Sequence, residues 1–127
     1  MTIATGFAGE AADVLLMKAI FTELAGGEAH ATTAQSTWED YDISAIIPAG
    51  AVSALVMIYN SYGTAYTVGA RKNGSALART FVVGAGAGEE VTLLTEVDAN
   101  RILELYDSSG TPGLVDFSIM GYWKYGA

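Results

Sequence analysis

The sequence contains no cysteine, so it can form neither a disulfide bond nor a thiolate metal site, and it offers no cysteine nucleophile. Its single histidine, His30, lies in a small polar segment, and no second imidazole exists to join it. Transition-metal sites and catalytic triads need several convergent groups. We therefore predict that His30 is an exposed loop residue, that the chain binds no metal and no cofactor, and that it is not an enzyme.

Basic residues are also few. Six lysines and arginines stand against fourteen aspartates and glutamates, which gives a formal net charge of -8. A nucleic acid would meet net repulsion in place of the usual basic footprint, so nucleic-acid binding is disfavoured. The acidic excess favours solubility and approach to a basic partner surface.

The chain has no long apolar run. The best candidate, residues 14–21, is interrupted by Lys18 and is too short to cross a bilayer. The first ten residues lack the basic region of a secretory signal. We predict a soluble chain with no membrane partner and no removed leader, and the fifteen glycines with only two prolines fit a β-rich chain with many turns.

Residues 10–24 are the one candidate for a helix. Glu10 and Asp13 fall in the first turn, where the helix dipole favours acidic groups, and Gly26 and Gly27 supply a stop. Apolar residues follow two stripes at helical spacing, more than one contact face needs. Two alternatives stay open: a short helix or strand packed on the domain's own sheet, or a segment that buries its second face against a neighbouring subunit.

From residue 38 the apolar pattern changes to that of strands. Residues 51–59 carry apolar side chains on both pleat faces, and Asn73-Gly74 between residues 65–72 and 77–83 is a strong hairpin signal. Further strands are predicted at 91–97, 101–106 and 114–125, with no crossover helices between them. We predict an all-β fold, an antiparallel β-sandwich or jelly-roll-like domain of about seven to eight strands.

The predicted organisation is an N-terminal arm with one short helix at residues 1–36, serving assembly or anchoring, followed by the sandwich domain at 37–127. The predicted core consists of alternating apolar positions in the strands. These positions are Ile43, Val52, Ala54, Val56, Ile58, Val68, Phe81, Val83, Leu93, Ile102, Leu105, Phe117 and Ile119.

Acidic residues offer two chemical hypotheses, and neither has a supporting motif. Glu39, Asp40 and Asp42 with the loop aspartates could hold calcium, but the EF-hand spacing is absent and strand neighbours point to opposite faces. Glu104 with Asp116 could act as a glycosidase acid and base, but a short sandwich leaves little room for a cleft. We expect solvated charges, and no catalytic residue.

Contact surfaces are the better candidates. Aromatic rings supply contact area at low entropic cost, and they crowd the C-terminal segment. Arg71, Lys72 and Arg79 make the hairpin a local positive spot, or simply protect a strand edge. The candidate interface residues are Val14, Leu16, Met17, Ile20, Phe21, Leu24, Tyr62, Tyr122, Trp123 and Tyr125.

Four segments carry a resemblance to a known family. They are W-x-x-Y-D-I-S-A-x-I-P-A-G-A at 38–51, V-G-A-R-K-N-G-S at 68–75, V-D-A-N-R-I-L-E-L-Y at 97–106, and G-Y-W at 121–123. Together they resemble small β-sandwich domains of tailed-bacteriophage virion proteins, such as capsid decoration and fibre modules; residues 1–36 lie outside the resemblance.

The resemblance implies a non-enzymatic structural protein, made in the host cytoplasm and located in the virion. It implies assembly on a symmetric lattice, usually as trimers, with the major capsid protein or another virion protein as partner. A capsid decoration or cement protein is the leading hypothesis. The alternative is a receptor-recognition or carbohydrate-binding module of a tail or head fibre.

Overall fold

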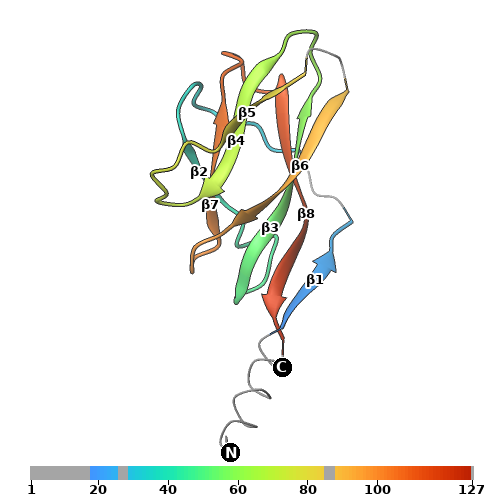
Figure 1. The fold of residues 1–127 in the computed structure, drawn as a ribbon, viewed down its shortest axis with the longest axis vertical. Helices are drawn as coiled ribbons and strands as arrows, with labels where there is room; N and C mark the ends of the chain where they lie inside the picture. The colour runs from blue at the N-terminus through green and yellow to red at the C-terminus, as the bar shows by residue number, and fades with distance from the viewer. Residues whose placement is uncertain (1–17, 26–28, 85–87, 127) are drawn as a thin grey trace, which may run out of the picture.

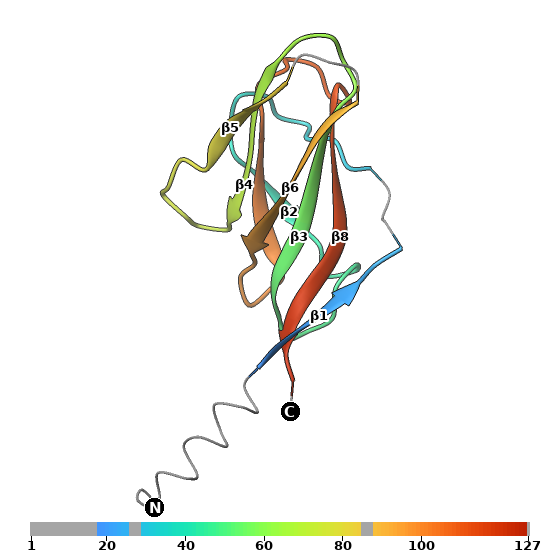
Figure 2. The ribbon, with the colours of Figure 1, turned by 45° about the vertical axis from the view of Figure 1, so that its right-hand side comes forward.

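The computed structural model describes residues 18–25, 29–84 and 88–126, and these residues form strands and loops without a helix. The eight strands lie in two layers (Figures 1 and 2). They are β1 (Ala19–Glu23), β2 (Glu39–Asp42), β3 (Ala51–Asn60), β4 (Tyr66–Lys72), β5 (Thr80–Val83), β6 (Glu89–Glu96), β7 (Ile102–Asp107) and β8 (Val115–Tyr125). The predicted all-β antiparallel sandwich is confirmed.

Each layer is a four-stranded sheet. One has the order β1-β8-β3-β6 and the other the order β2-β7-β4-β5, and every pairing is antiparallel. The long strands β3 and β8 occupy the middle of the first sheet, and β4 and β7 the middle of the second. The edge strands are β1, β2, β5 and β6, and the four central strands bury more of their residues than these edge strands do.

The core fills the space between the two sheets. Its largest fully buried side chain is Phe117 of β8, which lies opposite Ile58 of β3. Most of the predicted core is buried, while Phe81 and Leu93 are partly buried against it. The prediction was wrong for Val52, which is only partly buried and does not belong to the core cluster. The prediction was wrong for Ile102, because Leu103 and Leu105 face inward in β7 and Ile102 is only partly buried.

Arg101 explains why β7 begins one residue later than predicted, at Ile102 and not at residue 101. It adopts a left-handed conformation with φ of 63°, and its backbone N–H donates to the carbonyl of Asp98 in a tight turn before β7. Its side chain reaches back to the carbonyls of Ser44 and Ile47, at 3.1 Å and 2.9 Å. The turn therefore extends to Arg101 and not only to Asn100. The first side chain of β7 that faces the core is then Leu103.

The predicted helix is wrong for the residues that the structure describes. Residues 19–23 form the edge strand β1, which pairs with β8 from Ala19 opposite Tyr125 to Glu23 opposite Gly121. A short apolar run fits both helical and strand spacing. A helix of this length is only marginally stable by itself, whereas a strand at this position forms backbone hydrogen bonds with the edge of β8. Residues 10–17 of the predicted helix lie outside the described residues.

The loop between β1 and β2 is also attached to the sandwich. His30 forms an antiparallel bridge with Phe117, and both backbone hydrogen bonds are 2.8 Å long. The carboxylate of Glu39 accepts hydrogen bonds from the backbone of Thr33 and Ala34, the shortest at 2.7 Å. Segments before residue 37 therefore contribute one strand and one bridge to the same sheet that β3 and β8 build.

Candidate interaction surface

The outer side of the sheet β1-β8-β3-β6 carries an exposed apolar surface. Residues directly opposite one another in antiparallel strands share a face of the sheet. One such row runs Phe21, Trp123, Ser53 and Glu96 across all four strands. Because Ala54, the neighbour of Ser53, is fully buried in the core, this row points away from the core.

The next row extends the apolar area. Gly121 lies opposite Leu55, and Leu55 lies opposite Leu94 of the edge strand β6. Leu94 is 62% exposed, which is unusual for a large aliphatic side chain in a strand. Beside this row, Tyr125 is 52% exposed at the end of β8. We call Phe21, Leu55, Leu94, Trp123 and Tyr125 the outer apolar face.

The aromatic pair at its centre is well packed. The rings of Phe21 and Trp123 lie with their centroids 4.6 Å apart at 49°. Gly121 makes this possible, since a Cβ at that position would collide with the Phe21 ring. A shallow depression of about 280 Å³ follows Trp123 and Tyr125 toward Leu94. The surface therefore has the relief and the rigid aromatic anchors that a protein interface uses.

Two bulges in the β3–β8 pair place these aromatics. The register shifts between Ala51 and Ser53, and again between Leu55 and Val56. A bulge reverses which side chains face inward. Tyr122, opposite Ala54, consequently packs against the core, and Trp123 turns outward.

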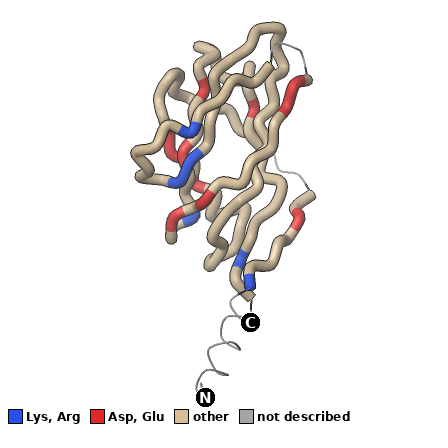
Figure 3. The backbone as a smooth tube through the Cα atoms, viewed as in Figure 1, with Lys and Arg blue, Asp and Glu red and all other residues tan. Residues whose placement is uncertain are grey.

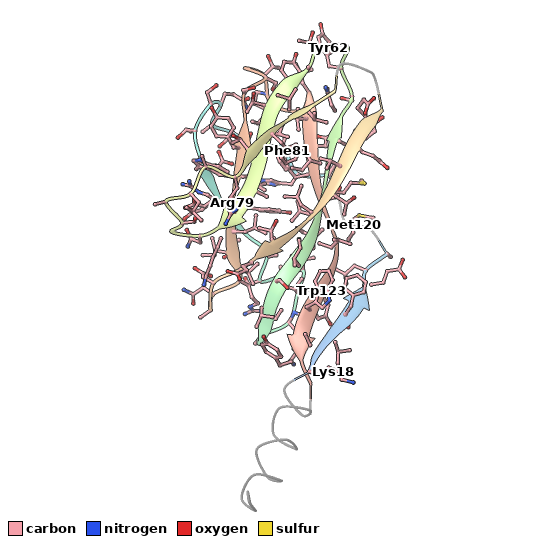
Figure 4. The ribbon with its side chains drawn as sticks, in the orientation of Figure 1. Lys18, Tyr62, Arg79, Phe81, Met120 and Trp123 are labelled. Atoms are coloured by element: carbon pink, nitrogen blue, oxygen red, sulfur yellow. The ribbon has the colours of Figure 1, made fainter. Side chains whose placement is uncertain are left out.

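The structure brings together some of the predicted interface residues and separates others. Phe21, Trp123 and Tyr125 share the outer apolar face, whereas Ile20, 53% exposed, lies against Gly126. Leu24 and Tyr122 pack against the core. Tyr62 is 51% exposed in the turn between β3 and β4, away from this face (Figure 4). Val14, Leu16 and Met17 lie outside the described residues.

Leu55 and Leu94 were missed by the sequence reasoning. Residues 51–59 alternate between buried and partly buried positions, so the second apolar stripe of this strand faces the outer side and not a second covering layer. In residues 91–95 the two leucines are adjacent, so one must face the core and the other the surface. The sequence alone does not show that Leu94 is the exposed one. Only the register across the sheet assigns both residues to one exposed face.

No family model matches this chain, and a search of curated proteins finds no significant relative. The functional argument therefore rests on the residues themselves.

The acidic residues do not gather into a metal site or a catalytic pair in the part of the chain that the structure describes. No group of three or more His, Asp and Glu side chains converges there. Glu104 lies in β7 and Asp116 in β8 of the other sheet, and Glu104 is already paired with Arg71 at 2.6 Å. Burial raises the pKa of Asp116, and the nearby Asp107 adds to this.

Within the described ranges, no helix has the length and apolarity to cross a bilayer.

His30 is not an exposed loop residue as predicted. Its ring stacks on Tyr41 with centroids 3.8 Å apart at 9°, and its Nε2 is buried with no hydrogen-bond partner among the described residues. Burial lowers the pKa of His30 below its ordinary value, and the charge of Glu39 opposes this only in part. Burial by itself would raise the pKa of Glu39, but the hydrogen bonds from Ala34 and Thr33 outweigh it and lower that pKa.

The partly buried imidazole of His30 predicts a loss of stability on mild acidification. Because the folded-state pKa of His30 is lowered from 6.5, the unfolded chain binds the proton first, so stability falls as the pH drops below about 6.5. The variant His30→Phe keeps a ring on Tyr41 but cannot titrate. Denaturant unfolding at pH 7.5 and pH 5.5 should show a larger loss for the wild type. An equal loss in both proteins would contradict the assignment; Glu39 titrates below this window because its pKa is lowered.

Proposed function

We propose that this protein is a non-enzymatic virion structural protein of a tailed bacteriophage, a capsid decoration or cement protein that binds the capsid surface as an oligomer. The outer apolar face is the observation that carries the proposal. An acidic chain that exposes Phe21 and Tyr125 beside a partly buried Trp123 on one sheet presents a surface typical of a protein interface. The sequence resemblance to virion β-sandwich domains supplies the identity of the partner, the major capsid protein or another virion protein.

The position of the face supports assembly. It includes the edge strand β1, which follows Lys18 and a mostly apolar segment, residues 1–17, in the sequence. An interface that begins on the outer apolar face can therefore continue into this segment. A trimer is the favoured oligomer, because the virion β-sandwich domains that the sequence resembles usually assemble as trimers.

Charge introduction on the outer apolar face tests the proposal. The variant Trp123→Glu, and separately Tyr125→Glu, should lower the solution mass from that of an oligomer to that of a monomer and abolish saturable binding to purified capsids. In the assembled state the new carboxylate would lie in a dry interface without a positive partner. An unpaired charge of this kind costs several kcal/mol of binding free energy. Light scattering and co-sedimentation with capsids provide the two readouts.

The matched control is Val82→Glu, which adds the same charge at a residue of the other sheet that is 67% exposed. It should leave mass and capsid binding unchanged, and thermal unfolding should confirm that every variant is folded. A wild-type protein that is monomeric and ignores capsids at micromolar concentration would refute the proposal.

A receptor- or carbohydrate-binding module is the second candidate, favoured by a separate observation. Tyr62, 51% exposed, stacks near Tyr66 with ring centroids 6.5 Å apart. Exposed tyrosine rings suit sugar stacking as well as protein contact. A glycan array distinguishes the two candidates, because a decoration protein has no need for sugar affinity, whereas a fibre module should bind a glycan and lose it in Tyr62→Ala.

A further inference from the structure

The β4–β5 hairpin and β6 enclose a second surface feature, a groove of about 870 Å³. It opens where the ends of β4 and β6 approach one another from different sheets (Figures 1 and 2). Its floor is apolar, with Ala70, Phe81 and Leu93, and Leu77 of the hairpin loop forms part of one wall. This volume is within the range of ordinary ligand sites.

The charge of the groove is opposite to that of the protein. Arg71, Lys72 and Arg79, half of the six basic residues, line it, whereas Glu96 is the single acidic residue of the described segments that does so. Figure 3 shows basic positions gathered on this hairpin. Arg71 is paired with Glu104, but neither Lys72 nor Arg79 forms an ion pair with any carboxylate in the described part of the chain. Two cations therefore remain available to an acidic ligand.

The groove also has unpaired backbone on its border. The β4–β5 pairing ends at Gly69 opposite Thr80, so residues 70–72 of β4 have a partner strand, β7, on one side only. Of these three residues, Lys72 already uses its carbonyl, which accepts from the Ser75 N–H in the hairpin turn. On the other wall, β6 pairs with β3 alone and ends its sheet. Strand edges of this kind accept an added strand, because its main-chain groups complete the hydrogen-bond ladder.

A buried hydroxyl points to the same ligand chemistry. Thr95 of β6 lines the groove and is only 3% exposed, yet its Oγ1 has no hydrogen-bond partner in the described structure. A buried polar group without a partner costs free energy that a ligand can recover by supplying one. A peptide amide would provide the donor or acceptor that this hydroxyl lacks.

The basic wall is held in place before any ligand arrives. The Arg71 guanidinium stacks on the Trp38 ring at 4.0 Å and donates to the carbonyl of Leu77 at 2.9 Å. Glu104, which accepts from Arg71, also accepts from the backbone N–H of Gly74 at 3.2 Å. The hairpin loop is thus fixed by its own contacts, which reduces the ordering cost of binding.

We propose that this groove binds an extended acidic peptide segment of a partner protein, which adds a strand beside residues 70–72 and directs carboxylates toward Lys72 and Arg79. The unpaired strand edge and the apolar floor favour a peptide over an anionic sugar, which would use the charges alone. Alternate apolar side chains of the peptide face Phe81 and Leu93. The groove adjoins the outer apolar face at Leu94, which lines both, but its charged wall lies on the β4–β5 hairpin, and its proposed ligand goes beyond the proposed capsid attachment.

The test uses the full-length protein and a fluorescent synthetic peptide of alternating valine and glutamate, followed by fluorescence anisotropy. Saturable binding is expected, weakening as salt rises, with no binding of the matched valine–lysine peptide. Arg79→Glu should weaken binding by roughly tenfold or more, because it replaces an attractive charge with a repulsive one. Lys124→Glu, the same change at an exposed residue of β8 outside the groove, should not.

Thr95→Val separates recognition from folding. It removes the unpartnered hydroxyl while keeping the shape, so peptide binding should weaken several-fold while the unfolding midpoint stays equal or rises. Absence of saturable peptide binding, or equal affinity in Arg79→Glu and the wild type, would overturn the proposal. Displacement of the peptide by a heparin oligosaccharide at equal affinity would overturn it in favour of an anionic sugar.

Discussion

The variant Phe117→Ala is expected to lose about 3–5 kcal/mol of unfolding free energy, a large part of the total for a domain of this size. Phe117 is fully buried near the start of β8 and is the largest fully buried side chain of the core. Its ring fills space between the two sheets, and the surrounding strands are hydrogen-bonded on both sides, so the cavity cannot close by a small shift. The lost transfer free energy and the residual cavity add.

Denaturant unfolding followed by tryptophan fluorescence measures this effect. The matched control is Val82→Ala, since Val82 is 67% exposed and its truncation should change stability by less than about 0.5 kcal/mol. The backbone bridge between His30 and Phe117 does not depend on the phenylalanine side chain, so the loss reports packing and not the bridge. A loss below about 1 kcal/mol would show that the space between the sheets is not packed as described.

The second large effect is expected for Asn60→Asp. Asn60 is fully buried at the end of β3, and its Nδ2 donates to the carbonyls of Thr64 and Gly84 at 2.8 Å and 2.9 Å, while its Oδ1 accepts from the backbone N–H of Tyr62 at 2.9 Å. An aspartate of the same shape removes both donors and places a carboxylate against two carbonyl oxygens. At pH 7 we expect a loss of about 3–5 kcal/mol, the usual cost of an uncompensated buried charge.

The pH dependence identifies the cause. Burial and the two carbonyls favour the protonated form, so the folded-state pKa of the new carboxyl lies above its unfolded value. The penalty is then small at low pH and grows as the pH rises through the range between these two pKa values. The difference in unfolding free energy between variant and wild type should therefore be smaller at pH 4 than at pH 7. Asn100→Asp, in an exposed turn, is the control and should change little; a pH-independent difference would contradict the charge explanation.

Local sequence patterns predicted most of the strands because their apolar periodicity and turn residues agree with the sheets. Residues 51–59, 91–97, 101–106 and 114–125 correspond closely to β3, β6, β7 and β8. The hairpin was predicted in the right place but is longer at its tip. The turn closes at Asn73-Gly74 through the Ser75 N–H and the Lys72 carbonyl, yet β5 starts only at Thr80 because Arg71 and Glu104 hold the intervening loop.

The rest depended on contacts between distant segments. Strand β1 exists because β8 offers an open edge about a hundred positions later in the chain, which no local pattern can show. The outward turn of Trp123 depends on a bulge opposite β3, and the burial of His30 depends on a bridge to Phe117. The aromatic candidates at the C-terminus could be predicted by composition, but their grouping with Leu55 and Leu94 required the register of four strands.

The pairing of β1 with β8 has a mechanical consequence. Lys18 and Gly126 are joined by a backbone hydrogen bond of 3.0 Å, so the outer ends of these antiparallel strands lie side by side (Figure 1). Tension applied between these two positions breaks the β1–β8 hydrogen bonds one after another, starting at the outer end. It does not load all of them at once, as shear along the strands would. Strand β1 would peel away at low force while the two long central strands, loaded along a different direction, keep the remaining sandwich intact.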